Sequence, residues 1–522
     1  MLVSLKHRAI ILNVRNPNQL KAIIPTATEF LYRGRVLMAV PHRLDEVQVL
    51  RNMGIEAPSP IESYYDWQGV DKPFDVQRVT AGAATIHKRL YVLNQMGTGK
   101  TNAAAWAGDY LMRQGKIRRA LITCPLSCME RVWGDALFAI SPEASVSMLY
   151  GDAKRRIKRL DEDADWYIIN HDGLKIPSVL EAIQEREDIE LVIVDELAEF
   201  SNTRTDRWKA LNRVINGDRK RKEPRREWAW GLTGTPTPTA PTDAFAQCKL
   251  LTPDTVPQYF GNFRERVMRP YGPYKWVARD DANDTVFKAM QPAVRFSRDD
   301  CLDLPPRMTT VRHCELSEEQ QRAYNEMFKK LKAEVMGGQI TAQNAAIKAL
   351  KLAQIAVGVV YDNHHGEIIL PSPQRLDTLK EVIQESQGKV IVYVPFTGAL
   401  NHLVDCISRY ASVGMVDGSV SKGRRDDVFR EFQNGNEMRV LVAQPGAMSH
   451  GLTLTASNTI VWYGPTNSNR IYTQANDRIT RAGQVMRQFI VQLEGTPLER
   501  AMYADLQKQT DSQQALLDLF AS

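Results

Sequence analysis

The sequence predicts an α/β protein with two consecutive lobes, each built on a parallel sheet, and a small α+β module in front of them. Short apolar segments rich in β-branched residues alternate with longer segments of helical periodicity. Several apolar segments run into polar loops that contain glycine or threonine, and the pattern starts again near residue 388. Strands that alternate with helices form parallel sheets covered on both faces, and ligands gather at the carboxyl ends of such strands.

The length and composition set the limits of this prediction. A chain of 522 residues is too long for one hydrophobic core and suits three or four compact units. Its net charge of +6 permits a polyanionic partner without requiring one. The segment MLVSLKHRAIILNV lacks a long apolar core followed by a small-residue cleavage site, and the sequence has no apolar run of 18 residues and no zinc-site spacing among its six cysteines. We therefore expect a cytosolic protein with reduced thiols and no membrane contact.

Residues 1–70 are predicted to form the small α+β module. The alternating apolar segments HRAIILNV, LKAIIPTA and GRVLMAVPH predict two or three strands. The segment RLDEVQVLRNMGI, which follows them, has the character of a helix. A proline-containing stretch after it is typical of a linker.

The first strong chemical signal is NQMGTGKT at residues 94–101, which lies between a short apolar strand and an alanine-rich helix. Backbone N–H groups of such a loop point at phosphate oxygens, Lys100 adds a positive charge, and the Thr101 hydroxyl suits magnesium. Asn94 stands where the common pattern has its first glycine, a change that is tolerable if Asn94 adopts the needed backbone angle, since asparagine accepts positive φ. The predicted nucleotide contacts of the loop are Met96, Gly97, Thr98, Gly99, Lys100 and Thr101.

Two further strands of the first lobe end in residues suited to the same chemistry. IELVIVDELAEF places Asp195 and Glu196 at the end of a buried strand, where a carboxylate is costly unless it faces a metal or a cleft. We expect Asp195 to hold magnesium and Glu196 to orient or deprotonate the attacking water. WAWGLTGTPTP ends in Thr233 and Thr235, which suit a hydrogen-bonded relay.

The second lobe has no phosphate loop of its own. This pattern predicts a nucleotide held between the two lobes, with arginines supplied by the second. Two basic clusters, AKRRIKRL at 153–160 and DRKRKEPRREW at 218–228, fit either a polyanion path or ordinary solvated surface. The aromatic residues Trp462, Tyr463 and Tyr472 fit either base stacking or a core.

The segment YTQANDRITRAGQ, at residues 472–484, resembles the last motif of the Swi/Snf-like branch of superfamily 2 helicases. The residues that match the motif are Gln474, Ala475, Asp477, Arg478, Arg481, Gly483 and Gln484. The resemblance implies two RecA-like lobes. It also implies that Arg478 and Arg481 act as arginine fingers on the γ-phosphate and that Gln474 contacts the nucleotide.

Other segments follow the order of the family's motifs. FDVQ looks like the segment whose glutamine, Gln77, reads the adenine edge. LDLPP at 302–306 resembles the entry to the second lobe, and SHGLTLTAS at 449–457 is similar to a segment that contacts the DNA backbone. Two departures bear on the coupling of hydrolysis to movement: Ala198 replaces the usual histidine of the D-E-x-H motif, and NQMGTGKT replaces D-E-M-G-x-G-K-T.

By this resemblance the protein is expected to be an ATP- and Mg²⁺-dependent DNA translocase or helicase that acts on duplex or branched DNA as a monomer. The residues 1–70 could grip duplex DNA or a protein partner, and the compact size favours a bacterial or phage setting. One rival is an RNA-directed or strand-separating helicase, and another is an ATP-gated DNA-binding scaffold with little hydrolysis. The predicted divisions are 1–70, a first lobe at 71–255, an inter-lobe segment at 256–305, a second lobe at 306–498 and a helical brace at 499–522.

Overall fold

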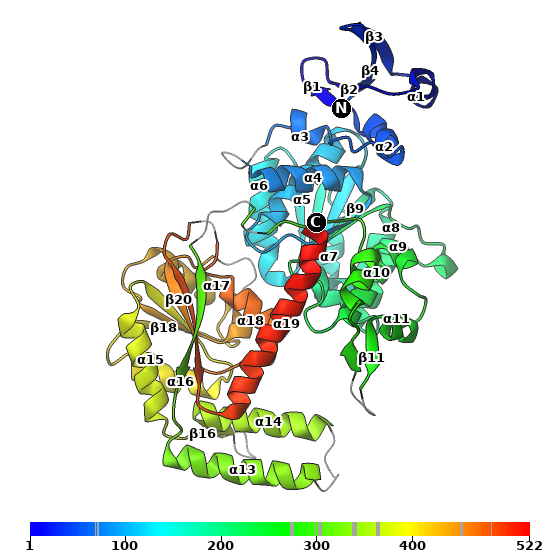
Figure 1. Cartoon of the computed structure of the whole chain (residues 1–522). Coiled ribbons are helices and arrows are strands. Elements are labelled where there is room, and N and C mark those ends of the chain that lie inside the picture. Colours follow the sequence, from blue (N-terminus) through cyan, green and yellow to red (C-terminus); the bar gives the residue numbers. More distant parts are fainter. Residues whose placement is uncertain are drawn as a thin grey trace. The chain divides into compact units, whose positions relative to one another are not determined.

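The computed structural model forms two compact units, and each is described by itself (Figure 1). The first contains Met1–Cys301 and Ala515–Ser522, and the second contains Leu302–Gln514. The structure describes residues 1–67, 69, 73–271, 276–297, 299–300, 305–336, 342–361, 366–448, 453–481 and 483–521. Within these ranges, none of the helices is both long enough and apolar enough to cross a bilayer.

The N-terminal module is a four-stranded antiparallel sheet with two helices on one face (Figure 1). Its elements are β1 (Leu2–Ser4), β2 (Ala9–Leu12), α1 (Pro17–Ile23), β3 (Thr28–Tyr32), β4 (Arg35–Pro41) and α2 (Leu44–Asn52). The strand order is β1-β2-β4-β3. Alternate residues of β2 and β4 point into a small core with the two helices, as the period of a half-buried strand requires. The prediction of two or three strands was one strand short.

The first lobe is built on a seven-stranded parallel sheet of order β13-β5-β10-β9-β6-β8-β7. Its strands are β5 (Arg89–Val92), β6 (Arg119–Cys124), β7 (Val146–Leu149), β8 (Trp166–Asn170), β9 (Ile189–Asp195), β10 (Trp228–Leu232) and β13 (Ala293–Val294). The edge strand β13 comes from the segment predicted to lie between the lobes, and it pairs with β5.

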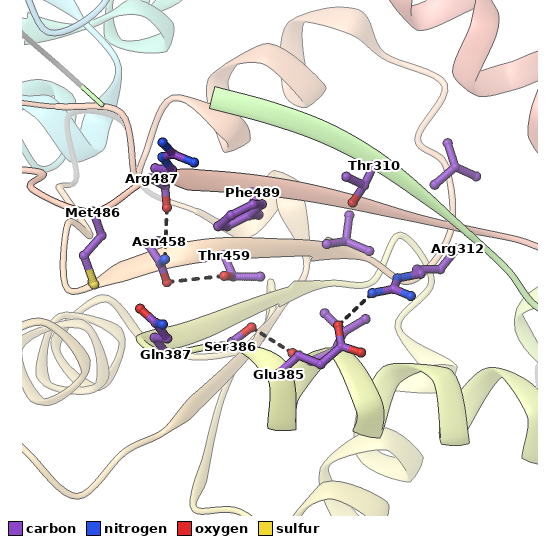
Figure 2. A pocket seen from close by; sticks show the side chains of 13 residues that line it. Thr310, Arg312, Glu385, Ser386, Gln387, Asn458, Thr459, Met486, Arg487 and Phe489 are labelled. Carbon is purple, nitrogen blue, oxygen red and sulfur yellow. Dashed lines mark hydrogen bonds and ion pairs between the residues drawn. The ribbon is translucent and has the colours of Figure 1, made fainter. Parts of the chain in front are cut away.

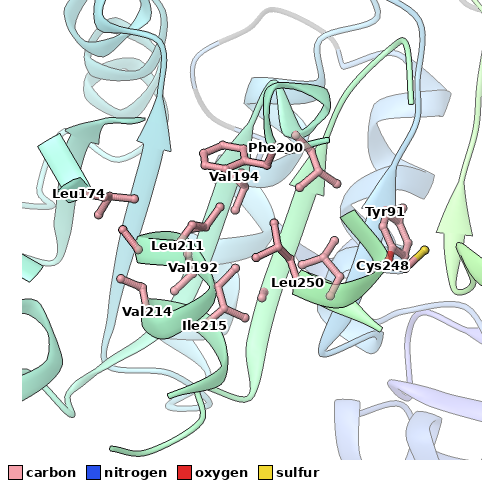
Figure 3. Packing of buried hydrophobic residues seen from close by; sticks show 14 of the residues in the cluster. Tyr91, Leu174, Val192, Val194, Phe200, Leu211, Val214, Ile215, Cys248 and Leu250 are labelled. Carbon is pink, nitrogen blue, oxygen red and sulfur yellow. The ribbon is translucent and has the colours of Figure 1, made fainter. Parts of the chain in front are cut away.

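Helices cover both faces of this sheet, as expected for parallel strands joined by crossovers. They are α3 (Ile61–Tyr64), α4 (Asp75–Ile86), α5 (Lys100–Arg113), α6 (Asp135–Ile140), α7 (Ala153–Leu160), α8 (Pro177–Glu185), α9 (Asp206–Asn216), α10 (Ala244–Leu251), α11 (Phe260–Val267) and α12 (Ala282–Ala289). A hairpin, β11 (Met268–Pro270) and β12 (Trp276–Ala278), follows α11. Figure 3 shows one of the two cores, where Val192 and Val194 of β9 meet Leu211 and Ile215 of α9.

The second lobe has a six-stranded parallel sheet of order β14-β21-β20-β17-β19-β18. Its strands are β14 (Arg307–His313), β17 (Lys389–Tyr393), β18 (Val413–Val416), β19 (Val440–Ala443), β20 (Ser457–Trp462) and β21 (Gln488–Glu494). Its helices are α13 (Glu318–Met336), α14 (Ala342–Val357), α15 (Pro373–Glu385), α16 (Gly398–Ile407), α17 (Lys422–Asn434), α18 (Asn469–Asn476) and α19 (Pro497–Ala521). A hairpin, β15 (Val359–Tyr361) and β16 (Glu367–Ile369), follows α14.

A buried ion pair joins the C-terminal helix α19 to the rest of the second lobe. The Arg375 guanidinium donates to Glu499 Oε1 at 2.8 Å, and the two side chains are 2% and 0% exposed. Arg375 also donates to the backbone oxygen of Tyr463, and the Tyr503 hydroxyl of α19 donates to the backbone oxygen of Trp462. The first part of α19 is therefore an integral element of this lobe.

The aromatic side chains considered for base stacking belong to the core. Trp462 is 0%, Tyr463 1% and Tyr472 6% exposed. Trp462 packs 4.8 Å from Tyr472 between ring centroids, and its indole N–H donates to Asn476. The stacking alternative was wrong, because Trp462 ends the doubly covered central strand β20, Tyr463 is buried directly after it, and Tyr472 of α18 packs against Trp462.

We expect Arg375→Ala to destabilise the second lobe strongly, because it leaves the Glu499 carboxylate buried without its counter-charge. Breaking a buried ion pair from one side costs about 3–5 kcal/mol, which corresponds to a fall in melting temperature on the order of 10 °C. Thermal unfolding followed by circular dichroism measures it. The matched control is Arg430→Ala, which removes an exposed pair with Asp427 and should leave the melting temperature nearly unchanged.

Candidate nucleotide-binding site

The loop between β5 and α5 has the backbone shape of a phosphate cradle. Gly97 and Gly99 both adopt left-handed conformations, with φ of 88° and 79°. Gly99 is the residue that precedes α5, so the helix begins at Lys100 and turns its free N–H groups toward the loop. Glycine is favoured at position 99 because its φ of 79° is rarely adopted by residues with a side chain, and a Cβ there would also lie 1.9 Å from the amide nitrogen of Gln77.

Gln77 is held against this loop from α4. It is 6% exposed, and its Oε1 accepts a hydrogen bond from the Phe74 backbone N–H at 2.9 Å. This bond fixes the amide so that its nitrogen faces Gly99. The residue expected to read the adenine edge therefore lies beside the predicted phosphate loop.

Asn94 supports the loop in a different way from the one expected. The non-glycine residues with positive φ in the described chain are Arg8, Arg33, Glu196 and Lys222, so Asn94 does not take the backbone angle of the replaced glycine. The buried Asn94 amide instead donates to Thr80 Oγ1 at 2.7 Å and accepts from the Phe296 N–H at 2.9 Å. Asn94 thus ties the strand end to α4 and to the segment after β13, a role that a glycine lacks.

Lys100 and the loop threonines are positioned by the same strand end. The Lys100 ammonium donates to the backbone oxygens of Asn94 at 2.8 Å and Gln95 at 3.2 Å. The Thr98 hydroxyl donates to Gln95 O at 2.9 Å, whereas Thr101 lies partly exposed in the first turn of α5. Met96 is also partly exposed in this loop.

Three sequence motifs meet because their strands are neighbours in the sheet. β10 pairs with β5 on one side and with β9 on the other, and Leu232 stands opposite both Val92 and Asp195. The Thr233 N–H donates to Val92 O at 3.0 Å, and Thr235 N–H donates to Thr233 Oγ1 at 3.1 Å. The phosphate loop, the threonine turn and the acidic pair therefore lie at one edge of the sheet.

Asp195 carries the clearest electrostatic signature of the site. Burial and the adjacent Glu196 charge raise the pKa of Asp195 to about 6, while the Trp133 hydrogen bond and the Lys100 charge oppose the rise. Trp133 Nε1 donates to Asp195 Oδ2 at 3.0 Å, and the Glu196 N–H donates to Oδ1 at 3.0 Å. Glu196 has φ of 50°, a strained conformation of the kind that clusters at functional sites.

The donor set of this edge fits magnesium. Mg²⁺ prefers oxygen ligands and is usually held by one or two carboxylates together with substrate phosphates and water. Asp195 supplies the carboxylate and Thr101 a hydroxyl, while the Lys100 charge lies close enough to lower the pKa of Asp195. These residues would hold the ion without a dedicated protein cage.

Residues that support the site escaped the sequence analysis. Trp133 lies in a π-helical turn at Met129–Gly134, a rare geometry that is frequent at functional sites. Arg295 is 4% exposed and donates to Leu93 O at 3.1 Å, at the strand end before the loop. Both lie far from Asp195 and the loop in sequence, so only the fold brings them together.

In the second lobe the arginine motif follows α18 and is fixed by hydrogen bonds. Asp477 accepts from Arg307 at 3.2 Å, and Gln484 donates to Ser457 O at 2.8 Å. Arg478 is 2% exposed, and its backbone oxygen accepts from Leu454 N–H. Arg481 is half-buried, and Gln474 is 7% exposed in α18. Residues 302–304 and 449–452 of the predicted motifs lie outside the described residues.

The two basic clusters are each partly structural. Arg156 of α7 is 6% exposed and donates to Leu149 O at 2.6 Å and Asn170 Oδ1 at 2.9 Å. Arg226 is 5% exposed and donates to Ile189 O at 2.9 Å. The exposed members of the clusters, which remain candidates for a polyanion path, include Lys154, Arg155, Lys158, Lys220 and Arg221.

A pocket of about 640 Å³ lies elsewhere in the second lobe, between β14 and the end of α15 (Figure 2). An Arg312–Glu385 ion pair of 2.7 Å crosses it, and Asn458 donates to Arg487 O at 3.0 Å. The pocket lies toward the amino ends of β20 and β21 and contains none of the predicted site residues.

Comparison with models of known protein families shows which family the chain belongs to. The model of the SNF2-related domain matches residues 90–357, which is half of the sequence. The chain belongs to this family. The model of the helicase conserved C-terminal domain matches residues 374–483. The Swi/Snf-like assignment, the tandem RecA-like fold and the class of helicase-like, ATP-using enzyme are confirmed.

Individual relatives are distant. Protein p41 of Acyrthosiphon pisum secondary endosymbiont phage 1 is 24% identical over 76% of this chain and 86% of its own. An ATP-dependent helicase of Mycoplasma genitalium is 23% identical over 80% of this chain, which spans only 39% of that protein. A Sulfolobus solfataricus SWI2/SNF2 ATPase core solved with dsDNA is 20% identical, with a TM-score of 0.41 over 84% of this chain and 91% of that one.

We expect Asp195→Asn to stabilise the nucleotide-free protein above pH 6. The raised pKa means that ionising Asp195 costs folding free energy, and this cost appears between its ordinary value near 3.8 and about 6 and is complete above that. The gain at pH 8 is up to about 3 kcal/mol. Melting temperatures from pH 4.5 to 8 should show a gain that shrinks as the pH falls.

The control for this series is Glu185→Gln on the exposed end of α8, which should give no gain at any pH. A gain from Asp195→Asn that stayed constant across the pH range would contradict the electrostatic explanation.

Proposed function

We propose that the protein is an ATP-driven translocase that moves along or remodels duplex or branched DNA. The observation that carries this proposal is the meeting of Lys100, Asp195 and the threonine turn at one edge of the first sheet. A lysine, a strained acidic pair and a glycine cradle at this edge suit phosphoryl transfer to water. The family supplies the context of an ATP-dependent, helicase-like enzyme.

We assign the roles in the first lobe as follows. Backbone N–H groups of the loop and Lys100 bind the phosphates. Thr101 and Asp195 would hold Mg²⁺, which would supply positive charge beside the phosphates. Glu196 orients or deprotonates the attacking water. Gln77 faces the loop through Gly99 and suits the adenine edge.

In the second lobe we favour Arg481 over Arg478 as the residue that contacts the γ-phosphate. Arg478 is 2% exposed, and its charge counteracts the burial that raises the pKa of Tyr393 within the same lobe. Arg481, three residues later, keeps part of its side chain accessible. We propose that Arg478 braces the motif while Arg481 stabilises charge in the transition state, and that Gln474 assists from α18.

Repeating phosphates allow motion along any polynucleotide sequence, and membership of the SNF2-related family supports DNA rather than RNA as the substrate. The exposed lysines and arginines of α7 suit such contacts. A monomer is enough for this cycle, and we propose a bacterial or phage setting, in line with the p41 and Mycoplasma relatives. The cytosolic location stays a prediction.

A panel of polynucleotides in an ATPase assay tests the proposal against its rivals. We expect duplex or forked DNA to stimulate turnover more than single-stranded DNA or RNA, with stimulation that falls steeply as salt increases. Strong preference for RNA would favour an RNA-directed helicase. The absence of turnover above background with every polynucleotide would favour an ATP-gated scaffold.

We expect Glu196→Gln to lower DNA-stimulated turnover by about 10²–10⁴-fold, because the amide cannot accept a proton from water. ATP binding, followed with a fluorescent analogue, should persist because the loop and Lys100 are intact. The partly buried Glu199, which pairs with Arg207 at 2.6 Å, offers a control: Glu199→Gln should retain turnover. Equal turnover in the unmodified protein and Glu196→Gln would remove Glu196 from the mechanism.

We expect Arg481→Ala to reduce turnover about 10³-fold while nucleotide affinity changes little. Single-turnover ATP hydrolysis measures the chemical step directly. The control is Arg487→Ala, an exposed arginine six positions later, which should leave the rate unchanged. Should Arg478→Ala alone reproduce the loss with a normal melting temperature, the finger would be Arg478.

A further inference from the structure

The excess positive charge of the protein is concentrated in its N-terminal module. Residues 1–54 contain eight lysines and arginines and only three acidic residues, whereas the whole chain has a net charge of +6. Almost all of the excess thus belongs to about a tenth of the sequence. Clustered basic charge of this kind is the electrostatic footprint of a nucleic-acid contact.

One face of the N-terminal sheet is open. Ile10 and Leu12 of β2 and Met38 and Val40 of β4 are buried under α1 and α2. The opposite face, together with residues of the first lobe, lines a groove of about 990 Å³, which we call the N-terminal groove. Its floor is formed by Ile11, Thr28, Phe30, Ala39 and Pro41, and its other wall includes Tyr64, Tyr110, Gln114 and Lys116.

Aromatic and basic side chains continue the open face toward the β3–β4 hairpin. Residues two apart in a strand share a face, so Tyr32 follows Phe30 on β3. Arg35 stands opposite Tyr32 on β4, and Tyr32 is 52% exposed. The Arg33 guanidinium lies 5.3 Å from the centroid of the Tyr32 ring. Aromatic rings beside cations on an open surface form a stacking platform for bases.

The rim of the N-terminal groove is also basic. Arg8 lies over the Tyr64 ring at 5.1 Å, and Arg43 is exposed beside it in the groove lining. Asp45 is the acidic residue of the lining, and it pairs with Lys116 at 2.6 Å. The net charge of the lining is therefore positive.

Both hairpin turns of the module place an arginine in a left-handed conformation. Arg8 has φ of 45° and Arg33 has φ of 49°. Such positions normally hold glycine or asparagine, because a larger side chain adds strain. Strained residues persist where their side chains have a task, which supports a functional role for these arginines.

We propose that the open face and the N-terminal groove bind single-stranded DNA, with bases on Phe30 and Tyr32 and phosphates against Arg8, Arg35 and Arg43. The groove has the volume of a small-ligand pocket, which suits a few nucleotides of a single strand. Stacking on aromatic rings also requires unpaired bases. This site goes beyond the proposed function, in which the two lobes act on duplex or branched DNA.

The double variant Phe30→Ala/Tyr32→Ala in the full chain tests the site. Fluorescence anisotropy with a labelled 15-nucleotide oligo-dT, without ATP, should show at least a tenfold loss of affinity, since each stacked base contributes substantially. The control is Leu31→Ala: Leu31 lies between them on the same strand, faces the other side and is 73% exposed. Its variant should bind as the unmodified protein does, and melting temperatures verify that all variants are folded.

A salt titration tests the phosphate contacts separately. Removing one contact to a single strand should reduce the slope of log affinity against log salt by about 0.7, so Arg35→Ala and Arg43→Ala should each show this change. Equal oligo-dT affinity in the double variant and Leu31→Ala would overturn the proposal. Tighter binding of oligo-U than of oligo-dT would overturn the assignment to DNA.

The test is independent of the motor. In the double variant, ATPase stimulation by duplex DNA should stay normal. In one outcome, the unmodified protein binds oligo-dT without any DNA-stimulated ATPase, and Phe30→Ala/Tyr32→Ala abolishes that binding. This outcome would support the single-strand site on the open face and contradict the proposed function.

Discussion

The arrangement of the first lobe depends on one constraint: two adjacent, partly buried carboxylates lie at the sheet edge close to the charge of Lys100. Burial and the charge of Glu196 raise the pKa of Asp195, and the Trp133 hydrogen bond and Lys100 lower it. An ionised Asp195 at this place lowers the free energy of unfolding of the protein, and a bound cation would offset this cost. In the proposed function, this electrostatic cost would be offset by a bound metal–nucleotide complex.

Sequence patterns were sufficient for the parts of this arrangement that are local. A strand, a glycine loop and a helix follow each other within residues 89–113, so spacing alone placed Lys100 and Thr101. The partners that come from distant segments could not be predicted in this way. Trp133 reaches Asp195 across 62 positions, and Phe296 reaches Asn94 across 202, because a parallel sheet brings remote strands together.

The role of Asn94 could not be predicted for the same reason. Its place in the motif suggested a role for its backbone conformation. The structure shows instead that the Asn94 side chain makes hydrogen bonds to Thr80 Oγ1 and to the Phe296 N–H. The aromatic residues of the second lobe were ambiguous for a related reason. Periodicity cannot separate a strand buried on both faces from one that exposes a face at its end, and the sheet order β21-β20-β17 places Trp462 in the centre.

The uneven charge distribution fits a division of labour within one chain. Outside residues 1–54 the positive and negative charges nearly balance, so a polynucleotide would meet only local basic patches on the lobes. Weak, salt-sensitive contacts suit surfaces that must grip and release in every ATP cycle, because a strong grip would slow each release. A basic module such as residues 1–54, which contains none of the residues proposed for hydrolysis, can instead stay bound. A DNA strand bound there would raise the effective concentration of DNA at the lobes and slow dissociation of the protein from DNA.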